Sequence, residues 1–150
     1  MYASRSRNRG EDIVAMISIE TIGYYSDDSN SQQYPMPFSF FYPNTGNFIG
    51  FVGNISSSQL LRRAIALFRK HSKFPSEGIA APGWITGIGW SDHWSFWKEG
   101  YPAIMITDTA PFRYKHYHTL QDMPDKIEYS RMARVVAGIS KVVGGIAGIN

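Results

Sequence analysis

The sequence predicts an α/β fold built around a central sheet. Short apolar runs of strand length alternate along the chain with longer segments whose apolar residues recur at helical spacing. Hydrophobic residues make up 43% of the 150 residues and charged residues 18%, which is typical of a folded globular chain. A chain of this length fits one domain with one core, and no internal repeat or interdomain linker divides it.

Three segments are predicted to form strands. Residues 12–19 (DIVAMISI) are apolar on almost every position of both alternating faces, as expected of a strand covered by helices on both sides. Residues 48–52 and 103–107 are two further short strands. Glu20 directly follows the first strand and Asp108 the third. Since ligands bind at the carboxyl ends of strands in open α/β sheets, we expect Glu20 to lie in a ligand-binding or catalytic site.

Two stretches without a regular period separate these strands from other elements. Residues 24–47 are rich in Ser, Asp, Asn, Pro and Tyr, and a structureless loop of this length is usually functional or disordered. Gly and Pro punctuate residues 75–89. Between the two stretches, one of the serines at 56–58 is expected to cap an amphipathic helix that ends near His71.

Two more helices are predicted towards the carboxyl terminus. Ser91 is expected to cap a short helix over residues 92–98, which Gly and Pro then close. Asp125, with Glu128 three residues later, resembles a capping box. It precedes a long final helix whose apolar residues continue at helical spacing.

Composition and charge argue against several functional classes. The net charge is only +3, and the basic cluster of Arg5, Arg7 and Arg9 is of a kind that usually forms a solvated helix face, so no nucleic acid is expected as partner. The sequence has no apolar run of membrane-spanning length and no signal-peptide core near Met1, so no membrane partner is expected and no compartment is assigned. Without cysteine, histidines and carboxylates are the possible metal ligands.

Three of the four histidines flank the predicted strand 103–107. His93 precedes this strand, and His116 and His118 follow it. A histidine in a loop is more often a hydrogen-bonded structural residue than a ligand, whereas a carboxylate beside an apolar strand, as at Glu20, must be solvated, paired or bound to a metal. Spacing alone does not connect these residues.

Two segments carry a resemblance to a known family. They read ISIETIGYYSD at 17–27 and SDHWSFWKEGYPAIMITDTAPFRYKHYHTLQDMPDKIEY at 91–129. Both are similar to the co-catalytic zinc aminopeptidases of clan MH, which are relatives of glutaminyl cyclases and glutamate carboxypeptidases. The resemblance spans nearly the whole chain, and its most specific parts are the strand end at Glu20, the Asp92-His93 helix start and the Tyr117-His118 pair followed by Asp122.

The resemblance implies a zinc-peptidase-like (phosphorylase/hydrolase-like) fold, a three-layer α/β sandwich with a central mixed sheet. It also implies a site that holds two zinc ions in the complete domain. Glu20 would bind one zinc and His118 the other, and Tyr117 would hydrogen-bond the developing oxyanion.

Three further residues of the similar segments are candidates for substrate binding. Arg113 either binds a substrate carboxylate or holds its loop through a backbone carbonyl. Asp92 is either part of the site or a helix amino-terminal residue stabilised by the helix dipole. His93 adjoins it and has no assigned catalytic role.

A complete site of this family also needs an upstream His, a carboxylate that bridges both metals, and a Glu-Glu pair that includes the general base. Ahead of Glu20 the acids are Glu11 and Asp12, and eight extended residues separate Asp12 from Glu20 by about 26 Å. Residues 1–150 are therefore expected to be the carboxyl-terminal portion of the domain, incomplete on its amino-terminal side. Zinc should bind weakly or not at all, and open sheet edges favour a homodimer.

Three functional hypotheses follow. In the first, the chain is a fragment of a zinc-dependent aminopeptidase that acts on peptide substrates, and is inactive alone. In the second, it is a metal-free interaction or scaffold domain. In the third, it is an acyltransferase of the glutaminyl-cyclase kind. Zinc occupancy and an upstream coding region would separate the first two, and the loop sequences are closer to peptidases than to the third.

Overall fold

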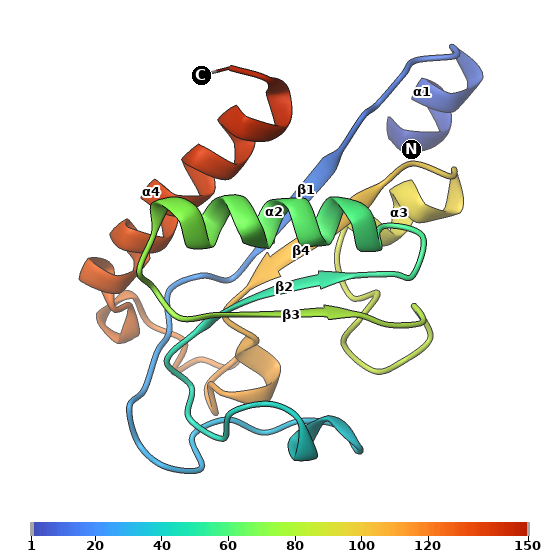
Figure 1. The fold of residues 1–150 in the computed structure, drawn as a ribbon. Coiled ribbons are helices and arrows are strands. Elements are labelled where there is room, and N and C mark those ends of the chain that lie inside the picture. Colours follow the sequence, from blue (N-terminus) through green and yellow to red (C-terminus); the bar gives the residue numbers. More distant parts are fainter. Residues whose placement is uncertain (1, 150) are drawn as a thin grey trace.

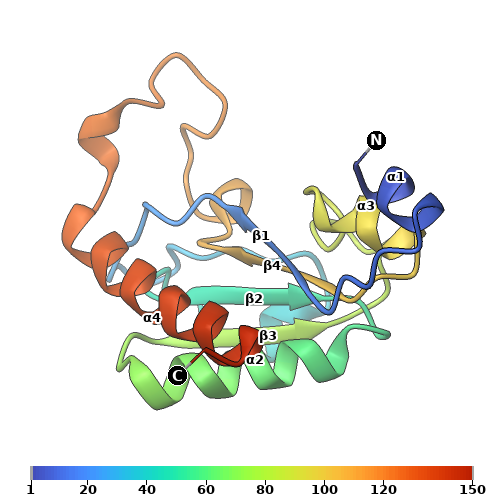
Figure 2. The same cartoon turned by 90° about the horizontal axis from the view of Figure 1, so that it is seen from above.

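The computed structural model describes residues 2–149, which form a four-stranded mixed sheet with helices on both faces (Figures 1 and 2). This architecture confirms the predicted α/β class. None of the helices in the described part combines the length and apolar character needed to cross a membrane. The helices are α1 (Tyr2–Asn8), α2 (Ser58–His71), α3 (His93–Lys98) and α4 (Tyr129–Ala147), and the strands are β1 (Met16–Glu20), β2 (Ile49–Gly53), β3 (Ser76–Ala80) and β4 (Ala103–Thr107).

The strands lie in the order β1-β4-β2-β3. β1 is parallel to β4 and β2 is parallel to β3, whereas β2 and β4 are antiparallel. In this register Glu20 pairs with Thr107, Thr107 with Gly50, and Gly50 with Glu77. These four residues form one row across the whole sheet, called here the Glu20–Glu77 row. Because paired residues of neighbouring strands point to the same face, Glu20 and Glu77 share a face.

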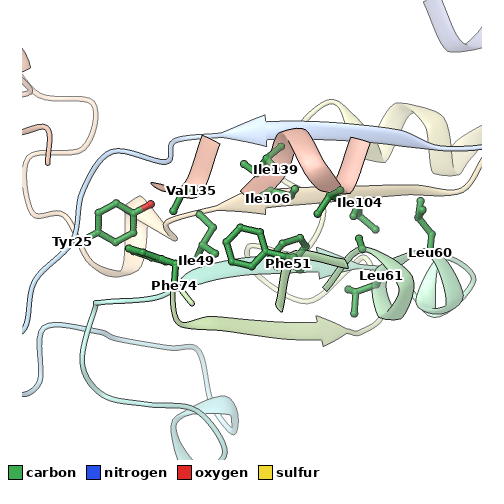
Figure 3. Close-up of a cluster of buried hydrophobic side chains, with 13 residues drawn as sticks. Tyr25, Ile49, Phe51, Leu60, Leu61, Phe74, Ile104, Ile106, Val135 and Ile139 are labelled. Carbon is green, nitrogen blue, oxygen red and sulfur yellow. The ribbon is translucent and has the colours of Figure 1, made fainter. Parts of the chain in front are cut away.

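The main core lies between the sheet and the helices α2 and α4 (Figure 3). Both helices contribute apolar residues at helical spacing, as the sequence predicts. The rings of Phe51 on β2 and Phe68 on α2 meet edge to face, with centroids 5.4 Å apart. The buried members of this core include Ile49, Phe51, Leu60, Leu61, Ala64, Phe68, Ile104, Ile106, Val135, Ile139 and Val142.

The opposite face of the sheet is covered partly by α3 and partly by loops. Val52 and Met105 point to this side and pack with Ile88, and the indole of Trp97 on α3 packs against them. The Trp97 indole also donates a 2.8 Å hydrogen bond to the Ala103 carbonyl and so fixes α3 beside the start of β4. Helices on both faces give the three layers that the family resemblance implies, and the loop-covered part of this face is where the candidate site lies.

The predicted strand over 12–19 is shorter than expected at its start, and one strand was not predicted. β1 begins only at Met16 because its partner β4 begins at Ala103, immediately after Pro102, so residues 12–15 have no strand beside them. β3 lies in the stretch 75–89, which the Gly and Pro content marked as a loop.

The capping box predicted at Asp125 and Glu128 is wrong. Asp125 lies in a 3-10 turn, Pro124–Lys126, where its carboxylate pairs with the adjacent Lys126. Glu128 occupies the N-cap position of α4 but makes no side-chain capping hydrogen bond. The helix itself is predicted correctly, because its packing against α2 and the sheet depends on the apolar spacing rather than on the cap.

β1 and β3 form the two edges of the described sheet. The outer backbone groups of an edge strand are available for pairing with another chain or segment. Self-association through these edges stays a prediction.

Replacing Gly138 with Ala should destabilise the protein. A Cβ at Gly138 on α4 would overlap the buried ring of Phe68. We expect the free energy of unfolding to fall by about 1–3 kcal/mol from overpacking, in spite of the roughly 1 kcal/mol gain in helix propensity. Urea unfolding followed by circular dichroism measures the change. Gly145→Ala is the matched control on the same helix: its Cβ meets only the flexible end of Leu67, so it should be neutral or stabilising. A Gly138→Ala variant as stable as the parent would refute this packing.

Candidate active site at the carboxyl ends of β1 and β4

Glu20 is the last residue of β1, and its half-buried side chain lies on the loop-covered face of the sheet. The Ser91 hydroxyl donates a 3.1 Å hydrogen bond to Glu20 Oε2 and lies 2.7 Å from the Ser18 hydroxyl oxygen. The prediction that Ser91 caps α3 is therefore wrong, since its hydroxyl holds the Glu20 carboxylate instead, and Asp92 occupies the N-cap position. Ser91 thus holds one carboxylate oxygen of Glu20 in place, while the carboxylate remains partly open to the adjoining pocket.

The backbone turns sharply directly after Glu20. Thr21 has φ 42°, a left-handed conformation that is a genuine outlier for a β-branched residue. The turn is held by Asp108, which follows β4: its N–H donates to the Thr21 carbonyl at 2.8 Å, and its Oδ2 accepts 2.8 Å hydrogen bonds from the N–H groups of Gly23 and Tyr24. Asp108 is 1% exposed. The sequence predicts an acid at the end of this strand but assigns it no role. In the structure, Asp108 holds the backbone that directly follows β1.

Tyr117 and His118 lie in the loop after β4. Their rings stack with centroids 3.9 Å apart, and His118 has φ 57°, a second left-handed conformation at the candidate site. Backbone strain of this kind concentrates at functional sites. Tyr117 borders the same pocket as Glu20, whereas His118 is exposed and does not line that pocket. Burial, followed by the negative charge of Glu20, raises the pKa of the Tyr117 hydroxyl, so the phenol keeps its proton at neutral pH.

Arg113 is buried beneath the loop of residues 24–47, called here the long loop. Its Nε donates to the Gln32 side-chain oxygen at 2.8 Å, and its Nη1 donates to the carbonyls of Tyr24 and Phe48 at 3.2 and 3.0 Å. These bonds match the structural alternative stated above, in which Arg113 holds backbone carbonyls. A substrate-binding role for Arg113 stays a prediction.

Asp92 and His93 mark the start of α3 and lie apart from the pocket at Glu20. The His93 ring is fully buried, donates from Nε2 to the Ile88 carbonyl at 2.7 Å, and meets the Trp97 ring edge to face. Burial lowers the pKa of His93, which favours the neutral ring. Asp92 is exposed at the N-cap position. Neither side chain lines the pocket at Glu20, and their role in substrate binding stays a prediction.

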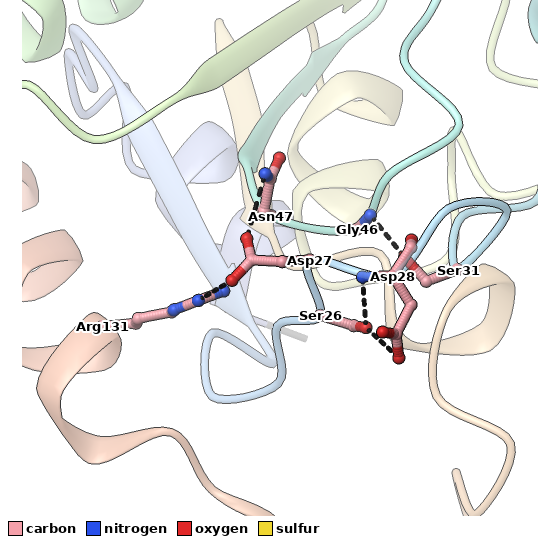
Figure 4. A network of polar contacts seen from close by, with 7 residues as sticks. All are labelled: Ser26, Asp27, Asp28, Ser31, Gly46, Asn47 and Arg131. Atoms are coloured by element: carbon pink, nitrogen blue, oxygen red, sulfur yellow. Dashed lines mark hydrogen bonds and ion pairs between the residues drawn. The ribbon is translucent and has the colours of Figure 1, made fainter.

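The long loop is ordered by polar contacts at both of its ends (Figure 4). Asp27 pairs with Arg131 on α4 and accepts a 3.2 Å hydrogen bond from the Asn47 side chain. The Gly46 N–H donates to the Ser31 hydroxyl at 2.8 Å. These contacts anchor the loop to α4 and to the start of β2, so the middle of the loop is held over the sheet.

The long loop closes a pocket of about 830 Å³ on the loop-covered face of the sheet, part of it open to solvent. Glu20 and Glu77, the two ends of the Glu20–Glu77 row, both line it, and so does Tyr117. Seven of its lining side chains are aromatic, Tyr117 and six others. The six that define this aromatic pocket are Tyr34, Phe38, Tyr42, Phe48, Trp90 and Phe112.

Comparison with known proteins decides the family. The family model described as "Peptidase family M28" matches residues 1–143. The chain belongs to peptidase family M28. It is also 42% identical over 125 residues to the "Uncharacterized protein YfbL" of Escherichia coli strain K12, a match that covers 83% of this chain and 39% of that protein. This M28 chain thus spans well under half the length of its curated relative, and the resemblance to clan MH peptidases is confirmed.

M28 peptidases are metallopeptidases that generally depend on zinc. A catalytic zinc site usually has three protein ligands. Within residues 2–149 the structure brings no three His, Asp or Glu side chains together in a group that could hold a metal. Glu20 has a serine hydroxyl as its neighbour, and Asp108 Oδ2 is occupied by backbone N–H groups while its buried Oδ1 has no hydrogen-bond partner in the described part of the chain. The described residues therefore do not amount to a complete zinc centre.

Replacing Asp108 with Asn should change the dependence of stability on pH. Burial raises the Asp108 pKa above its ordinary value of 3.8, so the folded chain binds a proton that the unfolded chain has already released. The cost of the buried charge is absent below about pH 4 and grows as the pH rises through the raised pKa. The free energy of unfolding of the parent minus that of Asp108→Asn should therefore fall with rising pH, as measured by urea unfolding between about pH 4 and pH 8.

Asp125→Asn is the control for this titration. Its hydrogen bond with Lys126 lowers the Asp125 pKa, so the small stabilisation it gives is present above the ordinary pKa and is lost as the pH falls. The corresponding difference for Asp125→Asn should therefore rise weakly with pH. A difference for Asp108→Asn that also rises, or stays flat, would contradict the buried charge.

Proposed function

We propose that this chain is the carboxyl-terminal part of an M28 domain that hydrolyses the amino-terminal bond of peptides with the help of zinc. We further propose that Glu20, Tyr117 and His118 are its contribution to the reactive site. The observation that carries the proposal is the position of Glu20, held by Ser91 at a strained strand end, in the same pocket as Tyr117. Carboxyl ends of strands are where α/β enzymes place their reactive groups.

Glu20 and His118 are proposed as ligands for different zinc ions in the complete domain. The half-buried Glu20 carboxylate accepts one hydrogen bond from Ser91 and keeps further lone pairs free for a cation. The exposed His118 ring is held against Tyr117 rather than packed in the core. Both side chains therefore remain available to a metal whose other ligands come from outside residues 2–149.

Tyr117 is proposed to stabilise the oxyanion that forms when water attacks the peptide carbonyl. Its side chain lines the pocket and makes no hydrogen bond within residues 2–149, and a phenol is protonated at neutral pH. A neutral phenol that borders the pocket can donate a hydrogen bond to a developing oxyanion, and such donors supply a large share of transition-state stabilisation.

The chain alone is proposed not to hydrolyse peptides. The two ligands proposed for zinc are fewer than an ordinary catalytic site uses, and no general base is identified beside Glu20. The missing donors would come from a segment that packs along the open edge of the sheet at β1, next to Glu20.

Joining this chain to the amino-terminal part of YfbL, in place of the YfbL region it matches, tests the proposal. The zinc-loaded product should hydrolyse aminoacyl arylamides and lose this activity on chelation. Glu20→Ala and His118→Ala should each lower kcat/KM by roughly 100-fold or more, because each removes a metal ligand. Tyr117→Phe should lower kcat by roughly 100-fold, the usual cost of removing one oxyanion donor.

His116→Ala is the matched control, since it removes a histidine of the same loop that has no proposed role. It should stay close to the parent. Full activity in the Glu20→Ala or His118→Ala variant would refute the ligand roles. A joined protein that folds but does not hydrolyse would favour the metal-free interaction domain, and cyclisation of glutaminyl peptides without hydrolysis would favour the acyltransferase.

A further inference from the structure

Glu77 lies at the end of the aromatic pocket opposite to Glu20. The two residues are the outer members of the Glu20–Glu77 row, so three strand spacings of roughly 4.8 Å put their Cα atoms about 14 Å apart. Both residues line the pocket. The residue of the row on β2 is Gly50, which has no side chain of its own and lies beside Thr107 and Thr109 in the pocket wall.

The walls between the two carboxylates suit a long, flexible aliphatic chain. Val52, Ile79 and Met105 continue the floor on the same face of the sheet, and the six aromatic side chains enclose it. Trp90 and Phe112 stack with centroids 6.1 Å apart and form one side of the mouth. Such surfaces bury methylene groups well and also attract a cation to their ring faces.

The charge of the pocket is negative. Its lining residues include two carboxylates and no Lys, Arg or His. Within residues 2–149, the Glu77 side chain makes neither an ion pair nor a hydrogen bond. Burial raises the pKa values of the nearby Tyr34 and Tyr42 hydroxyls, and the negative charge of Glu77 raises them further. Arg113, whose charge acts on the Tyr34 hydroxyl, donates to Gln32 and two backbone carbonyls through Nε and Nη1, while its buried Nη2 has no partner within the same residues. The partly exposed carboxylate of Glu77 has no partner among the described residues and can pair with a bound cation.

We propose that the aromatic pocket binds the side chain of an amino-terminal lysine or arginine and that Glu77 pairs with its cationic end. The inference rests on the proposed function, because hydrolysis near Glu20 requires the backbone of the amino-terminal residue to lie at the Glu20 end of the pocket. From there the side chain runs over Gly50 along the aromatic walls to Glu77. A neutral aliphatic side chain would gain the same apolar contacts but leave Glu77 without a partner, so Glu77 is a specificity-determining residue.

Binding of amino acid amides to the 150-residue chain tests the inference without any need for hydrolysis. Lysinamide, argininamide and norleucinamide are titrated into isotope-labelled protein, and the backbone amide signals of Gly50, Gly78 and Gly87 report on the pocket. Norleucinamide has the aliphatic side chain of lysine without the charge. Lysinamide and argininamide should bind roughly fivefold or more tightly than norleucinamide and shift these three signals.

Substitution of Glu77 identifies the source of the preference. Glu77→Gln should bring the affinities for lysinamide and norleucinamide to within about twofold, and Glu77→Lys should favour norleucinamide. Glu128→Gln is the matched control: it removes the same charge from an exposed position at the start of α4, and should keep the preference of the parent. Both Glu77 variants change a half-exposed residue of an edge strand, and circular dichroism verifies that they fold.

Three results would overturn the inference: norleucinamide bound as tightly as lysinamide, a preference that persists in Glu77→Gln, or signal changes away from the pocket. Each leaves the proposed hydrolysis standing, because that proposal is tested by the Glu20 and His118 variants of the joined protein. A joined protein without hydrolysis, beside intact lysinamide binding, would instead refute the proposed function and leave the cation-binding pocket.

Discussion

The buried carboxylate of Asp108 joins the ends of β1 and β4, and the geometry of the candidate site depends on it. Burial of this group is unfavourable, and two backbone N–H groups, from Gly23 and Tyr24, offset the cost by donating to the same oxygen. The backbone of Asp108 also holds the Thr21 carbonyl. Through these three bonds the chain turns immediately after Glu20, which leaves the Glu20 side chain at the strand end.

The difference between the two faces of the sheet explains where the pocket lies. On one face the large residues of β2 and β4, such as Phe51 and Ile106, fill the space beneath α2 and α4. On the other face the same strands place Gly50 and Thr107 near the carboxyl end of β4, and α3 covers only the opposite end of that strand. The long loop, anchored to α4 through Asp27 and Arg131, then closes the remaining space with aromatic side chains. One face of the sheet is thus closely packed, and the other carries the pocket.

The elements that depend on local sequence were predicted well. The strand 103–107 is a continuous apolar run and was predicted with its observed bounds, and the spacing in α2 and α4 predicted their buried faces. β3 was missed because SEGIA contains Glu and Gly and lies at a sheet edge, where apolar alternation is not needed. The cap assigned to Ser91 was wrong because a serine before a helix looks the same in sequence whether it caps the helix or bonds a carboxylate.

The candidate site was predicted only in part, for a physical reason. Glu20 and Tyr117 were predicted because a strand end and a family motif mark them; the two line one pocket, and their roles stay predictions. Glu77 was not found, because its place opposite Glu20 depends on pairing between β1, β4, β2 and β3, which are far apart in sequence. The partners of Arg113 are equally non-local, so its buried contacts with Gln32 and two carbonyls could not be predicted from its own neighbours.

We propose that this M28 chain carries part of a zinc centre and needs donors from outside itself to complete it. The most direct test is the zinc content of the purified chain after chelation, reloading and gel filtration, measured by elemental analysis together with the molecular mass in solution. The purified chain should retain no stoichiometric zinc. Stoichiometric zinc in the parent chain that is lost in both Glu20→Ala and His118→Ala would contradict it, because the chain, alone or as a homodimer, would then complete a metal centre with its own residues.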